Sequence, residues 1–133
     1  MDQIAPREAW QPLGPELEGR LMLPCRGDRT CLALRGTVDL SAADPLHTAL
    51  DELRATGGVQ LHVDLARVDL IDAAGVRVFA LTARDLEAQR GRLHLHNPAP
   101  IVVRVLDIAG LGRLLVAPRC EGACGTCDSH AHA

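Results

Sequence analysis

Hydrophobic positions follow two kinds of spacing that alternate along the 133 residues of the chain. Short apolar or strictly alternating runs indicate strands. We expect strands at 17–23, 31–36, 59–65, 93–96 and 114–116. Apolar residues three and four apart between these runs predict three helices. The expected order is therefore β-β-α-β-α-β-α-β, which predicts an α/β fold with a mixed sheet and helices packed on it.

The boundaries of these helices are indicated by capping and breaking residues. Ser41 to Asp44 resembles a capping box, and Pro45 fits a first helical turn. This helix is expected to end at Gly57. The second helix is expected over 73–89 and the third over 102–109, with a loop through Arg67 and Val68 before the second.

Composition is consistent with one domain built around an aliphatic core. Apolar residues make up 47% of the chain, with one Phe, one Trp and no Tyr. A chain of this length is a common size for a single domain. We expect a flexible lead-in at 1–15, the folded domain at 16–118 and a separate Cys- and His-rich tail at 119–133.

Charge and hydropathy exclude several classes of partner. The net charge is −3, and the basic residues are all Arg, spread among carboxylates, so no nucleic-acid partner is expected. The longest apolar run is shorter than the roughly 18 residues that a membrane span needs. The first sixteen residues show no export signal, so we expect a soluble cytoplasmic protein with reduced cysteines.

Four segments, in this order, resemble the STAS domain, and most closely the stand-alone anti-sigma-factor antagonists of that family. They are 34–40 (LRGTVDL), 63–76 (VDLARVDLIDAAGV), 93–98 (LHLHNP) and 105–111 (VLDIAGL). The resemblance implies a STAS-like mixed sheet of about five strands with helices packed on it. It also implies a protein-binding regulator that binds a kinase-type anti-sigma factor and so releases a sigma factor. No catalytic serine or cysteine motif is present, and we expect no enzymatic activity.

The resemblance also identifies a departure from the family. Family members carry a Ser directly after the Asp that corresponds to Asp72, and their kinase partner phosphorylates it. Here this position is Ala73, followed by Ala74, and neither side chain can form a phosphate ester. We therefore expect binding without phospho-control at the usual serine position.

The partner-binding surface implied by the resemblance lies at the start of the second helix. The expected residues are Asp39, Asp72, Ala73, Ala74, Gly75 and Val76. Asp72 is placed as a helix N-cap, and the family arrangement puts Asp39 beside it. We interpret Gly75 as allowing another chain to approach the backbone closely. Each Asp could equally be an ordinary cap or turn residue.

Histidine and cysteine residues provide candidate metal ligands. Cys120, Cys124, Cys127 and His130 could bind Zn²⁺ in the tail, although incidental cysteines in a disordered tail are the alternative. His94 and His96 share one strand face, where we expect a structural or surface role. Two other functions thus stay open. One is a STAS scaffold subunit of a larger signalling complex, and the other is a metal- or redox-sensing adaptor. Apart from the possible tail zinc, no cofactor is expected.

Overall fold

A computed structural model describes residues 9–22, 29–57 and 60–116 of the protein. The elements in these ranges are β1 (Gln11–Pro12), β2 (Leu17–Leu21), β3 (Arg29–Val38), α1 (Leu40–Gly57), β4 (Gln60–Ile71), α2 (Ala73–Ala88), β5 (Arg92–His96), α3 (Pro100–Ile108) and the 3₁₀ turn η2 (Gly112–Leu114).

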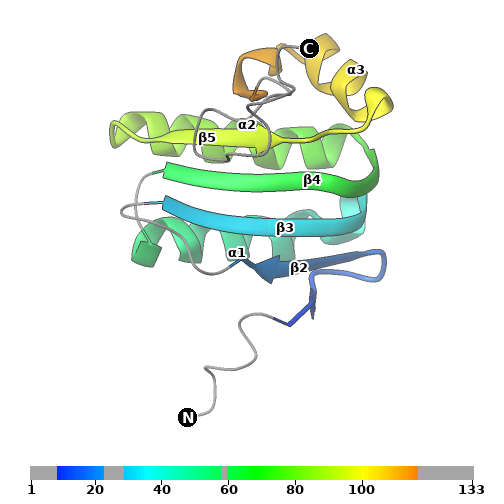
Figure 1. Cartoon of the computed structure of the whole chain (residues 1–133), viewed down its shortest axis with the longest axis horizontal. Helices are drawn as coiled ribbons and strands as arrows, with labels where there is room; N and C mark the ends of the chain where they lie inside the picture. Colours follow the sequence, from blue (N-terminus) through cyan, green and yellow to red (C-terminus); the bar gives the residue numbers. More distant parts are fainter. Residues whose placement is uncertain (1–8, 23–28, 58–59, 117–133) are drawn as a thin grey trace, which may run out of the picture.

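The strands form one mixed sheet in the order β1-β2-β3-β4-β5. The three N-terminal strands pair antiparallel, whereas β3, β4 and β5 run parallel. Helices α1 and α2 cover one face of this sheet, and α3 lies beyond the β5 edge (Figure 1). The predicted α/β class, with about five strands in a mixed sheet, is confirmed.

The core lies between this sheet and the two covering helices. Side chains of β4 alternate between the two faces, so Leu61, Val63 and Leu65 are buried whereas His62 and Asp64 face the other side. Phe79 of α2 is fully buried, and the rest of the core is aliphatic. This agrees with the core expected from the composition. On the opposite face of the sheet, at β2 and β3, the side chains of Arg20 and Arg35 stack on the ring of Trp10.

Strand β4 is longer than predicted and includes the residues expected to form a loop. Its pairing with β3 shifts register twice, between Ala33 and Arg35 and again between Gly36 and Thr37. At each shift β4 carries an extra residue, as in a β-bulge. The loop prediction through Arg67 and Val68 was wrong because these bulges interrupt the alternation on which a strand prediction depends.

Helix α1 begins earlier than the capping-box pattern indicated. It starts at Leu40, so Ser41 lies inside the helix and Pro45 lies beyond the first turn. Asp39 is the capping residue instead, because its Oδ1 accepts the backbone N–H of Ser41 at 3.0 Å. An Asp directly after a strand was an equally good cap, and the pattern alone did not separate the two choices.

The two ends of the sheet differ from the prediction. Strand β1 at Gln11–Pro12 falls in the segment predicted as a lead-in and was not expected. The strand predicted at 114–116 is not formed: Gly112–Leu114 is a 3₁₀ turn, and a single bridge joins Leu95 to Leu115. The apolar Leu114 and Leu115 reflect packing on the core, which does not require a strand.

Candidate partner-binding site

Asp39 and Asp72 follow the last paired residues of two neighbouring parallel strands. Val38 at the end of β3 pairs with Ile71 at the end of β4. The backbone N–H of Asp72 also donates to the carbonyl oxygen of Val38 at 3.0 Å. Carboxyl ends of parallel strands meet at one edge of a sheet, and this edge commonly carries binding sites. The strand register thus brings the two aspartates to the same edge.

The half-buried Asp39 side chain holds the first turn of α1. Besides the backbone N–H of Ser41, its Oδ1 accepts the hydroxyl of the exposed Ser41 at 2.6 Å. Both bonds use the same carboxylate oxygen. Within the described part of the chain, Asp39 makes no other side-chain hydrogen bond, so Oδ2 stays available to a donor on another molecule.

The Asp72 side chain holds the first turn of α2 in the same way as Asp39 holds that of α1. Its backbone is extended, with φ −107° and ψ −174°, and its Oδ1 accepts the backbone N–H of Gly75 at 3.1 Å. This is the N-cap predicted from the sequence. Among residues 9–22, 29–57 and 60–116, no side-chain hydrogen bond uses Oδ2 of Asp72. The edge therefore presents two half-buried carboxylates, each with one oxygen committed to a helix cap.

The residues of the first turn of α2 are small, and they differ in how far they are exposed. Ala73 is exposed, Ala74 and Val76 are half-buried, and Gly75 is buried. A Cβ built on Gly75 would lie 2.6 Å from Val38 Cγ1 and 2.9 Å from the Val38 carbonyl oxygen. The missing side chain therefore makes room for the chain's own strand. The interpretation of Gly75 as space for a partner chain was wrong, and its role is to seat α2 on β3.

Two exposed leucines flank the aspartates and were not among the predicted site residues. Leu40 follows Asp39 and is 76% exposed, and Leu70, two residues before Asp72, is 44% exposed. Large apolar side chains at this exposure commonly mark interaction surfaces when they gather at one place. Leu70 faces outward because of the second register shift in β4, which the sequence pattern did not show. Leu40 could have been noticed as an apolar residue directly after a capping Asp.

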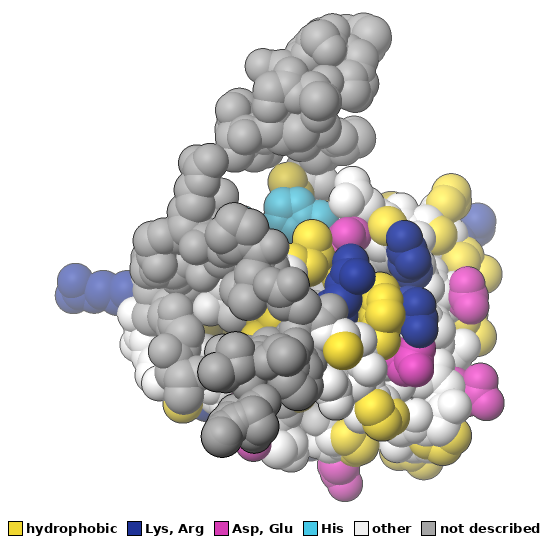
Figure 2. All heavy atoms as spheres, turned by 60° about the horizontal axis from the view of Figure 1, so that its bottom comes forward, with side chains coloured by type: hydrophobic (Ala, Val, Ile, Leu, Met, Phe, Trp, Pro, Cys, Tyr) yellow, Lys and Arg dark blue, Asp and Glu magenta, His cyan; other side chains and the backbone are white. Residues whose placement is uncertain are grey.

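The candidate metal ligands of the sequence have different outcomes. Cys120, Cys124, Cys127 and His130 lie outside the described residues. His94 and His96 do share the open face of the sheet, and there they meet His62 of β4. The His62 ring stacks on His94 with centroids 4.2 Å apart, and its Nδ1 lies 2.8 Å from Nε2 of His96. Histidines come together on the surface in Figure 2, beside arginines. The strand register, unknown from sequence, brings in His62.

Comparison with known proteins assigns the family. A family model described as "Mlab, STAS domain" matches residues 22–117. The chain belongs to the STAS domain family, as its motifs predicted. The matched segment contains both strand ends and the first turn of α2, so the site described above lies in the part that defines the family.

Similar proteins bear names of regulators. A putative anti-sigma factor antagonist, BtrV of Bordetella bronchiseptica, is 35% identical over 77 residues, covering 58% of this chain and 66% of that protein. The aligned part is thus just under two thirds of that relative. The anti-sigma-B factor antagonist of Bacillus subtilis is 31% identical over 90 residues, covering 67% of this chain and 82% of its own length.

Solved structures show the same fold. The unphosphorylated anti-sigma factor antagonist SpoIIAA superposes with a TM-score of 0.64 at 25% identity, covering 74% of this chain and 85% of its own. An anti-sigma factor antagonist from Mycobacterium paratuberculosis has a TM-score of 0.67 at 19% identity, and the match covers 83% of this chain and 94% of that one. At that identity the second likeness concerns the fold alone. In the described ranges, no helix is both long and apolar enough to cross a membrane.

Proposed function

We propose that this protein is an anti-sigma factor antagonist that binds an anti-sigma factor through the edge formed by Asp39, Asp72 and the first turn of α2. The observation that carries the proposal is the pairing of Val38 with Ile71, which brings both aspartates to one edge beside the exposed Ala73. Family membership and the names of the two relatives above support the same role.

The chemistry of the edge suits protein binding without catalysis. The two carboxylates have free oxygens for donors such as Arg or backbone N–H groups. Leu40 and Leu70 add exposed apolar area beside them. An interface of this kind combines an apolar contact with charged groups that fix its orientation. We propose that the partner is an anti-sigma factor of the kinase type, as in the family mechanism.

Ala73 makes the binding-competent state permanent in this proposal. The exposed methyl group at the start of α2 can accept no phosphate, so a kinase partner cannot add the charge of roughly −1.5 to −2 that phosphorylation brings. Control then passes to the amount of protein present or to another region of the chain. The tail at 119–133, with its proposed zinc ligands, is one such region.

The test is sigma release by the purified protein. Each kinase-type anti-sigma factor encoded in the same genome is first assembled with its sigma factor, and the complex is titrated with this chain. The proposal predicts that one complex dissociates, with the sigma factor eluting free in size-exclusion chromatography. A chain that binds none of these anti-sigma factors would contradict it. Stable association with a large assembly instead would favour the scaffold role.

A further inference from the structure

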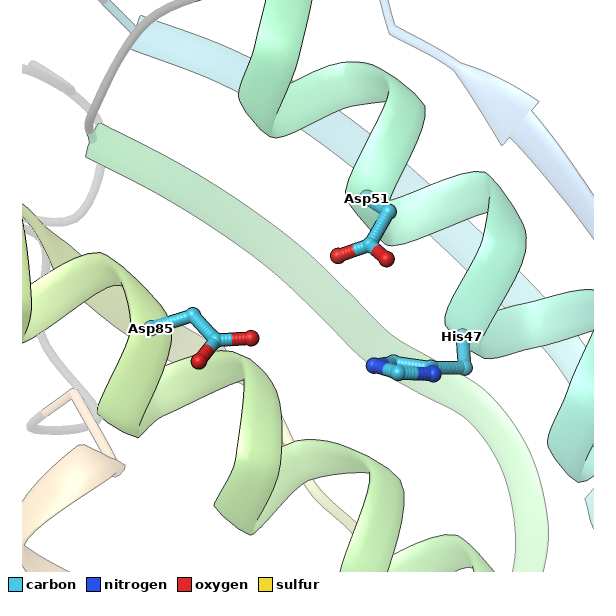
Figure 3. A group of neighbouring side chains, drawn as sticks. All are labelled: His47, Asp51 and Asp85. Atoms are coloured by element: carbon cyan, nitrogen blue, oxygen red, sulfur yellow. The ribbon is translucent and has the colours of Figure 1, made fainter.

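Three side chains of types that commonly bind metals lie close together between α1 and α2, away from the edge that carries Asp39 and Asp72. His47 and Asp51 lie one turn apart on α1, so they share one face of that helix. Asp85 reaches toward them from α2. One ligand atom from each of the three lies within 4.8 Å of the other two. Figure 3 shows the imidazole and both carboxylates turned toward the space between the helices.

The imidazole in this group lacks a hydrogen-bond partner. Nε2 of His47 is buried in the described structure and is bonded to no donor or acceptor there. A buried polar atom without a partner destabilises the folded protein, so such atoms are uncommon and call for a physical reason. The side-chain carboxylate of Asp85 likewise makes no hydrogen bond or ion pair within the described ranges. A cation bound between the three groups would give both side chains a partner.

The spacing fits an ion better than it fits direct contact. No oxygen of either Asp lies within the 4.0 Å of His47 that an ion pair requires. The three atoms are at most 4.8 Å apart, so a point between them lies no more than about 2.8 Å from each. Bonds from zinc to imidazole nitrogen and carboxylate oxygen are about 2.0–2.2 Å. Each ligand would therefore move inward by less than about 1 Å, which side-chain rotation can supply.

We propose that His47, Asp51 and Asp85 form a binding site for a divalent first-row transition cation such as Zn²⁺, which links α1 to α2. One imidazole and two carboxylates are a suitable ligand set for such ions, and the two negative charges balance the charge of the ion. Mg²⁺ prefers oxygen ligands and keeps several of its waters, so it should bind this site more weakly.

The surroundings of the site limit its affinity but leave it open to ions. The Arg54 guanidinium donates to Asp51 Oδ1 at 2.9 Å, which leaves Oδ2 of that carboxylate for the metal. The positive charge of Arg54 opposes the ion. The Asp51 side chain is 43% exposed, so water can reach the site and complete the coordination. We therefore expect a site with three protein ligands and bound water.

The experiment is thermal unfolding of the full, chelator-treated chain with and without Zn²⁺, with Mg²⁺ as a comparison. An ion that binds only the folded state raises the unfolding temperature, by about 5–10 °C at a hundredfold excess over its Kd. The variants are Asp85→Asn and His47→Gln, and Asp44→Asn is the matched control, an exposed Asp on the same helix. The Zn²⁺-induced rise in unfolding temperature must be compared between variants and wild type, because the cysteines of the tail are also proposed Zn²⁺ ligands.

The expected result is a Zn²⁺-induced rise in the wild type and in Asp44→Asn that falls to less than a third in the two site variants. Without metal, Asp85→Asn should unfold at the wild-type temperature or above it, because it removes one of two neighbouring negative charges. Its loss of response then cannot be ascribed to misfolding. Site variants that keep the full rise would overturn the proposal. So would a wild type that does not respond to about 1 mM Zn²⁺, or an equal loss in Asp44→Asn.

Discussion

The backbone N–H of Asp72 donates to the carbonyl oxygen of Val38 across 3.0 Å, and this bond joins the end of β4 to the end of β3. It fixes where α2 starts, because Asp72 caps that helix through Gly75. It also fixes the neighbouring edge residue, because Asp39 directly follows Val38. The proposed binding edge is therefore positioned by backbone pairing and by two caps, and one oxygen of each carboxylate is left to contact a partner.

Gly75→Ala should destabilise the fold. The added methyl group would lie 2.6 Å from Val38 Cγ1 and 2.9 Å from the Val38 carbonyl oxygen, so α2 or β3 must shift. Overpacking of this kind typically costs about 1–3 kcal/mol. Urea denaturation measures the loss. Gly112→Ala is the control, because a Cβ there meets only the Asp107 side chain, which can rotate away. Equal stability of Gly75→Ala and the wild type would show that the contact with Val38 is looser than described.

Asp72→Ala and Asp72→Asn should separate the capping role of this residue from its charge. Alanine removes the acceptor for the Gly75 N–H and should lower the free energy of unfolding by about 1 kcal/mol. Asparagine is also a good N-cap, so the stability of that variant should stay near the wild-type value. If the carboxylate contacts the partner, both variants should bind it more weakly. Full-affinity binding by Asp72→Asn would mean that Asp72 only caps the helix.

Ala73→Ser should create a phosphorylation site that the natural chain lacks. The new hydroxyl would lie on an exposed residue at the start of α2, where the resemblance to the family places the phosphorylated serine. Incubation with the proposed kinase-type partner and ATP, followed by mass spectrometry, should map a phosphate to position 73 in the variant alone. Ser41→Ala serves as a control, because Ser41 presents another exposed hydroxyl at the same edge that a kinase could modify. A phosphate within residues 70–80 of the natural chain would contradict the alignment.

Leu40→Ser and Leu70→Ser should both weaken partner binding, and Leu40→Ser should do so with little loss of stability. Leu40 is 76% exposed in the free protein, so its replacement removes little buried area from the fold, whereas Leu70, at 44%, gives up more. Full burial of an exposed leucine is worth about 1.5–3 kcal/mol, so Leu40→Ser should weaken binding about tenfold or more. The effect of Leu70→Ser should be smaller, because less of that side chain is left for a partner to bury. Ile108→Ser on α3 is the control, because Ile108 is 81% exposed and lies on another element. If Ile108→Ser weakened partner binding as much as the two leucine variants, the interface would not lie at the proposed edge.

The sequence predicted the parts of the fold that local periodicity determines. The strictly alternating segment at 93–96 and the helix with Val78, Phe79 and Leu86 on one face are both present as expected. The N-cap at Asp72 was likewise predictable, because a carboxylate before an apolar helical pattern is a strong local signal. Each of these features depends on residues close together along the chain.

Features that depend on contacts between distant parts of the chain were not predictable from the local pattern of residues. The two bulges in β4 turn Leu70 outward, and the register of β4 with β5 brings His62 to His94. Gly75 was interpreted from its position in the helix, but its need for space comes from Val38, 37 positions earlier. The meeting of His47 with Asp85 depends on how α1 packs against α2. All of these require long-range contacts that a single sequence does not specify.

The most direct test of the account is the affinity of Ala73→Asp for the anti-sigma factor, measured by calorimetry beside the wild type. Position 73 is exposed at the start of α2, where a negative charge interacts favourably with the helix dipole by about 0.3–1 kcal/mol. The variant should therefore fold with unchanged or slightly higher stability. Against a closely packed partner, an added charge without a counter-charge is costly. We predict at least tenfold weaker binding, about 1.4 kcal/mol. Equal affinities in a stable variant would show that position 73 lies outside the interface, and would contradict the proposed binding edge.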